Sequence, residues 1–285
     1  MSVAMAPVSP TVARWELVLR LRDLREQHGF DSAGFAKRVG FTPANWSHVE
    51  KGRRMLTTKT IGPVLDLLEV PDHERRELLE LLHMSKQRSW WAAAPIGQEL
   101  QRLYGMEFGA QSIRSYDSLV VPGLLQTEAY ARALISADVM IRPVQVDQLV
   151  EIRMRRQERL RGPDRVELTA LMGEAVLRQQ IGGLDVLRGQ LHHLAALLDE
   201  LDTVEVRIIP FSAPAGAVLG SSSFHLLDFA AAQLPTFGWV ESAVFGGAVD
   251  DREQVRDLSY AYARALELSF TRADSLSLIR RYADG

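Results

Sequence analysis

The chain of 285 residues contains no cysteine. This absence excludes disulfide bonds, thiol chemistry and cysteine-based zinc sites, and nothing requires an oxidising compartment. Long apolar runs are also missing, because no segment approaches the roughly 18 consecutive apolar residues of a membrane-spanning helix. The first ten residues contain no Lys or Arg, so they lack the basic start of a secretory signal. We therefore expect a cytoplasmic protein with no membrane partner.

Sequence patterns of enzymes and metal sites are absent as well. The chain has neither a His-Glu-x-x-His zinc motif nor a Gly-x-Ser-x-Gly nucleophile motif, and the glycine-containing segment 216–222 lacks the lysine of a phosphate loop. The adjacent His192 and His193 belong to a leucine-rich helical stretch, where neighbouring side chains point about 100° apart and do not readily share one metal ion. We expect no catalytic residues, no metal and no cofactor.

Positive charge is scarce overall but concentrated near the N-terminus. The formal net charge is −3, yet residues 14–54 hold nine basic and five acidic side chains, so the remainder of the chain carries −7. This division is typical of a basic nucleic-acid-binding module joined to an acidic domain. The length also favours two domains, since a single hydrophobic core tends to stop growing near about 250 residues.

The N-terminal pattern is helical. Apolar residues recur at three- and four-residue spacing and predict a helix over 14–28. A short helix is expected to begin at Asp31 or Ser32 and to end at Gly40, and Thr42 is expected to cap the next one. Two short helices joined by a tight turn predict a helix-turn-helix, and two further helices complete a mainly α, five-helix domain.

The second helix of a helix-turn-helix enters the major groove of double-stranded DNA with its leading residues. Asn and His hydrogen-bond base edges, an alanine methyl touches thymine, and Lys and Arg contact phosphates, which supply affinity rather than sequence information. The expected DNA contacts in and around this helix are Thr42, Ala44, Asn45, Ser47, His48, Lys51, Arg53 and Arg54. Trp46, in contrast, is expected in the core.

Residues 21–54 contain the frames L-R-x-L-R-E, F-A-x-x-V-G and W-S-x-x-E-x-G. They resemble the lambda-repressor/Cro-type (XRE) helix-turn-helix family. The resemblance implies a structural ion pair between Arg25 and Glu50, which fixes helix orientation and is costly to break. Family members often have Gln at the start of the second helix for a phosphate contact. This chain has Ser32 there, and we expect its hydroxyl and the helix N-terminus to hold the phosphate.

The rest of the chain mixes helical and strand patterns. Alternating residues predict strands over 166–172, 204–209, 223–229 and 236–241, with helices between and around them. We expect an α+β domain with several helices on a small, about four-stranded sheet. The arginine-rich helix over 145–160 is expected to expose a solvated charged face, and phosphate binding by its arginines is the alternative. The predicted organisation is 1–12 flexible tail, 13–88 helix-turn-helix domain, 89–110 linker and connecting helix containing the Trp90-Trp91 pair, and 111–285 C-terminal regulatory domain.

The second half of the chain also contains several motifs in an order that is known from other proteins. Among them are VPGLLQTEAYARAL, EIRMRRQERL, VRIIPF and LSLIRR. They resemble the large C-terminal domain found behind XRE modules in regulators from filamentous sporulating bacteria. The resemblance implies an antitoxin-like regulator that acts with a small acidic partner protein.

Three functions are weighed. The first is a regulator that binds an inverted-repeat operator as a homodimer, because one recognition helix covers only a short half-site, and that a small partner protein controls. The second is a small-molecule-responsive regulator, for which Glu174 and Glu241 are candidate pocket residues if both line one cavity; otherwise each is a structural acid. The third, an enzyme with a vestigial helix-turn-helix, lacks any catalytic motif. An exposed apolar patch favours the first, and an enclosed pocket favours the second.

Overall fold

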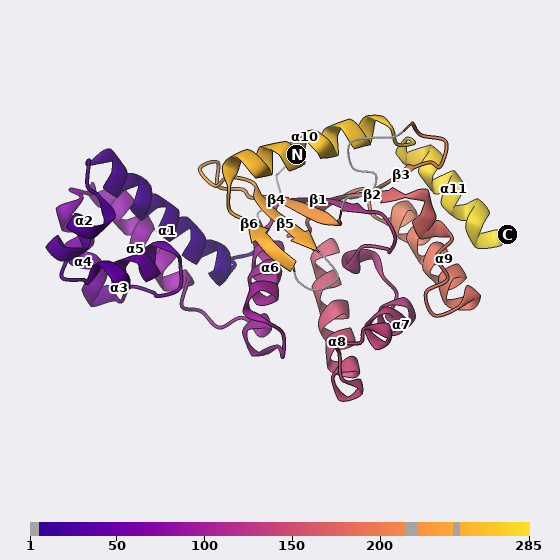
Figure 1. Ribbon diagram of the computed structural model, residues 1–285, viewed down its shortest axis with the longest axis horizontal. Coiled ribbons are helices and arrows are strands. Elements are labelled where there is room, and N and C mark those ends of the chain that lie inside the picture. Colours follow the sequence, from indigo (N-terminus) through magenta and orange to yellow (C-terminus); the bar gives the residue numbers. More distant parts are fainter. Residues whose placement is uncertain (1–5, 215–221, 242–245) are drawn as a thin grey trace. The chain divides into compact units, whose positions relative to one another are not determined.

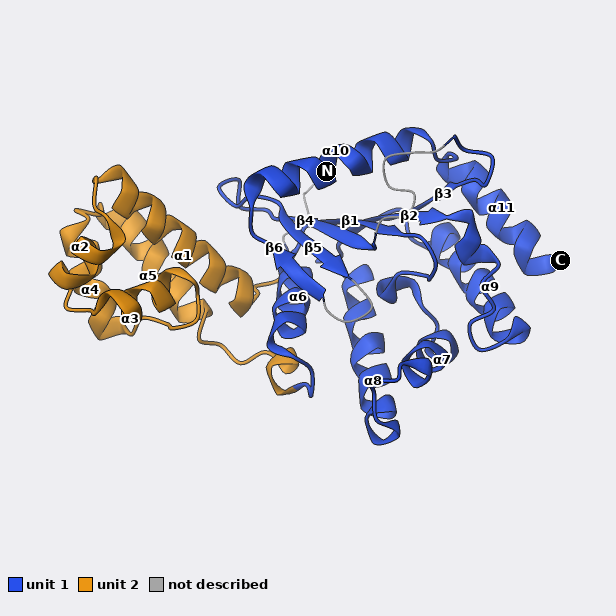
Figure 2. Cartoon of the chain, viewed as in Figure 1, with its two compact units in different colours: residues 1–6, 94–285 blue, residues 7–93 orange. Residues whose placement is uncertain are grey.

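The computed structural model describes residues 6–214, 222–241 and 246–285, and the glycine-containing segment 216–222 falls almost wholly outside this part. The chain divides into two compact units, Pro7–Ala93 and Ala94–Gly285, coloured separately in Figure 2. The first unit therefore extends past the predicted end at residue 88 and includes Trp90 and Trp91, whose rings pack edge to face at 5.5 Å. The connecting helix predicted after it belongs to the second unit.

Five helices of the first unit are labelled in Figure 1: α1 (Pro10–Gln27), α2 (Ser32–Arg38), α3 (Pro43–Glu50), α4 (Thr58–Leu67) and α5 (Asp72–Met84). Helix α1 starts within the predicted tail of residues 1–12, because Ser9 Oγ accepts from Val12 N and Pro10 fills the first helical position. Asp31 and Thr42 cap α2 and α3 through their side chains. A described core that includes Leu17, Phe35, Trp46, Ile61 and Leu78 joins the five helices.

The second unit is built on a sheet that has the strand order β3-β2-β1-β4-β5-β6 in the described residues. The strands are β1 (Ser112–Asp117), β2 (Glu167–Gly173), β3 (Val204–Ile209), β4 (Phe224–Asp228), β5 (Phe237–Glu241) and β6 (Gly246–Val249). β1, β2 and β3 are mutually parallel, whereas β4, β5 and β6 pair antiparallel, starting with β4 against β1.

The prediction of about four strands is wrong, because it omits β1 and β6. Four of the six residues of β1 are Ser, Arg, Ser and Asp, so its sequence does not read as a buried strand. β6 is Gly-Gly-Ala-Val and has no apolar alternation. Both strands are specified by their neighbours in the sheet rather than by their own residues.

Helices pack around the sheet. They are α6 (Gln98–Gly109), α7 (Glu128–Ala137), α8 (Val146–Arg156), α9 (Leu184–Glu200), α10 (Arg252–Glu267) and α11 (Arg272–Asp284), with short 3₁₀ turns at Trp90–Ala93, Gly123–Leu125, Pro143–Gln145, Gln157–Leu160 and Glu174–Leu177. In Figure 1, α10 crosses one face of the sheet, and α6, α7 and α8 lie on the opposite side. Tyr116 and Phe224 belong to the core under α10, together with Tyr262. Because side chains alternate along a strand, Ser115 and Asp117 face the α6–α8 side.

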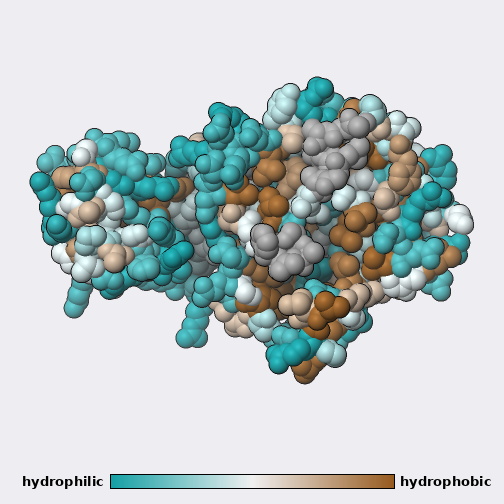
Figure 3. Space-filling model, viewed as in Figure 1, coloured by the Kyte–Doolittle hydropathy of each residue, from teal (hydrophilic) through white to brown (hydrophobic). Residues whose placement is uncertain are grey.

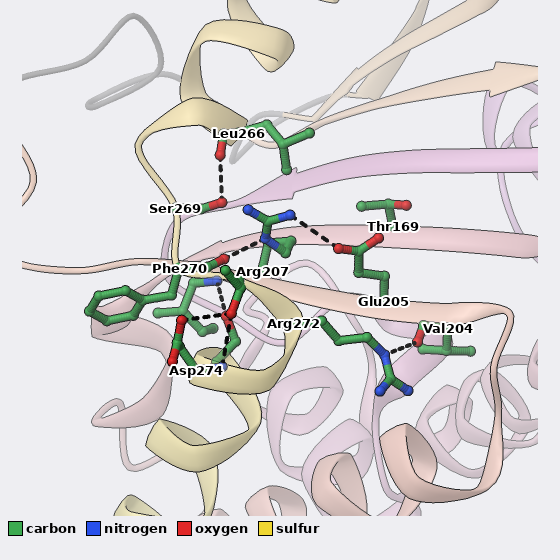
Figure 4. Close-up of polar contacts among 12 residues, drawn as sticks. Thr169, Val204, Glu205, Arg207, Leu266, Ser269, Phe270, Arg272 and Asp274 are labelled. Atoms are coloured by element: carbon green, nitrogen blue, oxygen red, sulfur yellow. Dashed lines mark hydrogen bonds and ion pairs between the residues drawn. The ribbon is translucent and has the colours of Figure 1, made fainter.

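The outer edge of β3 is covered by the junction between α10 and α11 (Figure 4). Phe270 N donates to Ile208 O at 2.8 Å, and Ile208 N donates to Ser275 Oγ at 3.0 Å. Arg207 Nε donates to the Phe270 carbonyl, and Arg272 Nε reaches the Val204 carbonyl. The bonds to Ile208 and Val204 occupy backbone groups that an open edge strand offers to another chain.

Candidate functional site

Helix α3, the predicted recognition helix, is fixed at its start and by its buried face. Thr42 Oγ1 accepts from Asn45 N at 3.2 Å, which sets where the helix begins. Trp46 and Val49 are buried, and the Trp46 ring packs 4.9 Å from that of Phe35 on α2. The opposite face turns outward: Ala44 and His48 are exposed, and Asn45 and Ser47 are half-buried.

Three exposed cations follow α3 directly. They are Lys51, Arg53 and Arg54, and in the described part of the chain none has a carboxylate within ion-pair distance. Arg53 N and Arg54 N both donate to His48 O, at 2.8 and 3.0 Å, so the backbone folds back against the end of the helix. The guanidinium of Arg54 also stacks 5.9 Å from the Phe41 ring. The result is a cationic rim at the end of a polar helix face.

A charged network ties this helix to the rest of the unit. Arg25 Nε of α1 donates to Glu50 Oε1 at 2.6 Å, and Arg25 Nη1 donates to the Phe30 carbonyl at 2.6 Å. The second oxygen of Glu50 accepts from Ser32 Oγ at 2.8 Å. The Ser32 hydroxyl therefore bonds inside the unit rather than lying free for a phosphate. The sequence frame gives the Arg25–Glu50 pair, but nothing in it identifies Ser32 as a third member.

The two candidate pocket acids of the second unit are not brought together. Glu174 follows β2 and accepts from Phe211 N and Tyr282 Oη, each at 2.7 Å, so both its oxygens hold structure. Glu241 ends β5, is exposed, and accepts from Trp239 Nε1 at 3.2 Å. β2 and β5 are separated by three strand spacings, roughly 14 Å.

A different polar cluster, which sequence reasoning missed, lies on the face of the sheet opposite α10. Ser115 and Asp117 of β1 are 1% and 4% exposed, and among the described residues Ser115 Oγ and Asp117 Oδ2 have no hydrogen-bond partner. Burial raises the pKa of the Asp117 carboxyl from 3.8 to about 6; nearby His225 opposes the rise and Glu241 adds to it. The signal in the sequence was two polar residues at alternate positions of one short strand.

The prediction of a solvated charged face on the helix over 145–160 agrees with the exposed Glu151, Arg155 and Glu158, but it is wrong for Arg156 and Arg159. Arg156 and Arg159 are each 7% exposed. Arg156 donates to both oxygens of Glu107 on α6, at 2.8 and 2.7 Å, and lies 4.2 Å from the Tyr104 ring. Arg159 donates to the carbonyls of Asp164 and Ala110. Arginines at three-residue spacing face one side of a helix, and here that side is the interior.

Residues 16–78 match a family model described as a helix-turn-helix domain, which supports an XRE/Cro-type DNA-binding domain. The chain thus contains a helix-turn-helix domain, which suggests a DNA-binding regulator. Residues 100–281 match the model described as domain of unknown function (DUF5753), which covers more than half of the chain. The chain belongs to the DUF5753 family.

Searches of curated proteins and of solved structures give no significant match. In the described part of the chain, no helix is both long and apolar enough to cross a bilayer. Among the same residues, no group of three or more His, Asp or Glu side chains is placed to hold a metal ion.

Replacement of Glu50 by Gln is expected to destabilise the first unit by about 3 kcal/mol, because it leaves the buried Arg25 guanidinium without its carboxylate. Urea unfolding of the full chain measures this loss. Glu26→Gln is the matched control, since Glu26 also contacts Arg25 but is 59% exposed, and its loss should stay below about 1 kcal/mol. Equal losses in the two variants would contradict a special role for Glu50.

The raised pKa of Asp117 predicts a pH dependence of stability. The folded state holds more protons than the unfolded chain between about pH 4 and pH 6, so its free energy of unfolding falls as pH rises through this window. Asp117→Asn removes the effect, so its stability relative to the parent should increase by about 3 kcal/mol between pH 4 and pH 7. Unfolding curves at several pH values test this, with Asp185→Asn, an exposed acid, as control. Parallel pH profiles of Asp117→Asn and the parent would refute it.

Proposed function

We propose that this protein is a cytoplasmic transcriptional regulator whose α3 helix reads an operator in the major groove. The observation that carries the proposal is the juxtaposition on α3: outward-facing Asn45 and His48 lead into the unpaired cations Lys51, Arg53 and Arg54. Side chains of the first kind discriminate bases, and those of the second kind neutralise phosphates. This role requires neither catalysis nor a cofactor.

We further propose that the protein acts as a homodimer on an inverted repeat. Helix α3 has eight residues, so one copy reaches only a short half-site. Two-fold pairing of such helices matches half-sites about one DNA turn apart and multiplies specificity.

Control through the second unit by a small partner protein is supported by an exposed apolar segment between α7 and α8. Val139, Met140 and Val144 are 95%, 79% and 83% exposed, with the exposed Arg142 between them. Figure 3 shows hydrophobic surface over the part of the molecule where Figure 1 labels α7 and α8. Exposed apolar side chains that gather in one segment are typical of a protein interface, and Arg142 suits an acidic partner.

Alanine substitutions in and after α3 are expected to separate affinity from specificity. Once a preferred sequence has been selected from random duplexes, Arg53→Ala should weaken binding to every duplex and lower the salt slope by about 1. Asn45→Ala should cost about 1–3 kcal/mol on the preferred sequence and little on scrambled DNA. Gel shifts at several salt concentrations measure both. Equal losses of Asn45→Ala on both duplexes would remove its base-reading role.

Replacement of Met140 and Val144 by Asp is expected to abolish co-purification of a small partner from producing cells, because it places charge on the exposed apolar segment. The variant should bind DNA as the parent does, since the two features lie in separate units. Val8→Asp, a single exposed apolar residue of the first unit, is the control and should retain the partner. Retention of the same partner by the double variant would place the interface elsewhere.

A further inference from the structure

The carboxyl end of β1 lies where the chain changes direction in the sheet. From β1 the chain passes through α7 and α8 to the parallel neighbour β2, and it later returns to pair β4 on the other side of β1. In open sheets with parallel strands, ligands bind beyond the carboxyl ends at such a reversal. Asp117 is the last residue of β1 and lies at this end. Glu241, the last residue of β5, lies at the same end of the sheet, because its N–H donates to Ser223 O, next to the start of β4.

Helix α8 and the 3₁₀ turn that follows it contribute three inward arginines, and in the described residues only Arg156 has a carboxylate partner, because Arg159 has only carbonyl partners and its Nε has none. Arg156 has a bidentate carboxylate partner, and Arg159 binds two backbone carbonyls. Arg153, in contrast, donates to a neutral amide, Gln126 Oε1, at 2.9 Å. In the described residues no carboxylate lies within ion-pair distance of it. Burial, together with the neighbouring Arg156, lowers the pKa of Arg153. Arg153 is half-buried, and a cation partly removed from water without an anion is costly, so it points to an anionic ligand.

Asp117 lacks a hydrogen-bond donor, just as Arg153 lacks an anion. Its Oδ2 atom and the Ser115 hydroxyl lie on the same face of β1, and both are buried without partners among the described residues. Buried polar atoms are normally hydrogen-bonded, and exceptions gather at functional sites. A carboxylate oxygen accepts hydrogen bonds, so the missing group is a donor.

A short chain of hydrogen bonds connects the two groups. Arg153 binds Gln126, whose Nε2 donates to the Val121 carbonyl at 2.6 Å. Val121 N donates to Tyr130 Oη at 3.3 Å, and Tyr130 is near enough to Asp117 for that carboxylate to raise the pKa of the phenol beyond the effect of burial. Glu241 likewise interacts electrostatically with both Asp117 and Arg153. The uncompensated cation and the unpartnered carboxyl therefore belong to one region.

We propose that this β1–α8 cluster, comprising Ser115, Asp117, Tyr130, Arg153 and Glu241, binds a small molecule that carries a carboxylate or phosphate for Arg153 and a hydroxyl or ammonium for Asp117. The inference concerns the DUF5753 unit and does not depend on DNA binding by α3.

Calorimetric titration of the full chain in an anion-poor buffer tests the proposal. The probes are glycolate, glycine and glycerol 3-phosphate, which carry both groups, and acetate and glycerol, which carry one each. At least one two-group probe should bind tenfold more tightly than either single-group probe, and its identity distinguishes a carboxylate from a phosphate. Arg153→Gln should weaken that probe tenfold or more, with partial recovery in Arg153→Lys. Arg155→Gln, on the exposed side of α8, should leave it unchanged.

Ser115→Ala keeps the test decisive if Arg153→Gln fails to fold. It removes a buried hydroxyl that has no partner of good hydrogen-bond geometry and only a weak interaction with Asp117, so the ligand-free chain should keep its Tm while affinity for the two-group probe falls. The proposal is overturned if no two-group probe binds more tightly than acetate and glycerol. It is equally overturned if Arg153→Gln binds as the parent does, or if Ser115→Ala lowers Tm with affinity unchanged. DNA binding, measured in parallel by gel shift, reports separately on α3.

Discussion

The ion pair between Arg25 and Glu50 is the contact on which the orientation of α3, and with it the proposed DNA-reading surface, depends. It joins α1 to the last residue of α3, and Ser32 adds the first residue of α2 to the same carboxylate. Each of these groups is wholly or partly removed from water, so displacement of any helix leaves a charge or a hydroxyl unsatisfied. The outward direction of Asn45 and His48 is therefore an electrostatic consequence as much as a packing one.

The second unit also has a buried ion pair that fixes its helices, but a neighbouring arginine has no carboxylate partner among the described residues. Arg156 and Glu107 compensate each other between α8 and α6, which holds those helices on one face of the sheet. One helical turn earlier, Arg153 has only an amide partner, and across from it Asp117 has an oxygen with no partner among the described residues. Neither departure stabilises the ligand-free fold. The Arg156–Glu107 pair thus stabilises the fold, whereas Arg153 and Asp117 keep unused hydrogen-bonding groups that a ligand could engage.

How far the sequence predicts this structure depends on where the determining contacts lie. The helices of the first unit are local: caps such as Asp31 and Thr42 and the apolar period identify them, and α1 to α5 form as expected apart from an earlier start at Ser9. β1 and β6 are not local, because their polar or glycine-rich residues become strands only beside β4 and β5. The bonding of Ser32 and the burial of Arg156 depend likewise on partners 18 and 49 residues away.

Membership of the DUF5753 family leaves the effector open, so it must be sought in features that the fold does not need. Two such features stand out in the second unit, and they have opposite physical character. The exposed side chains of Val139, Met140 and Val144 are apolar and suit another protein surface. The β1–α8 cluster is polar, with Ser115 and Asp117 buried, Arg153 half-buried and Glu241 exposed, and it suits a small molecule. Because one lies on the α7–α8 connection and the other includes Arg153 of α8, a ligand at the cluster and a partner at the surface act on the same helix. Control by a metabolite and control by a partner protein are therefore physically compatible in this chain.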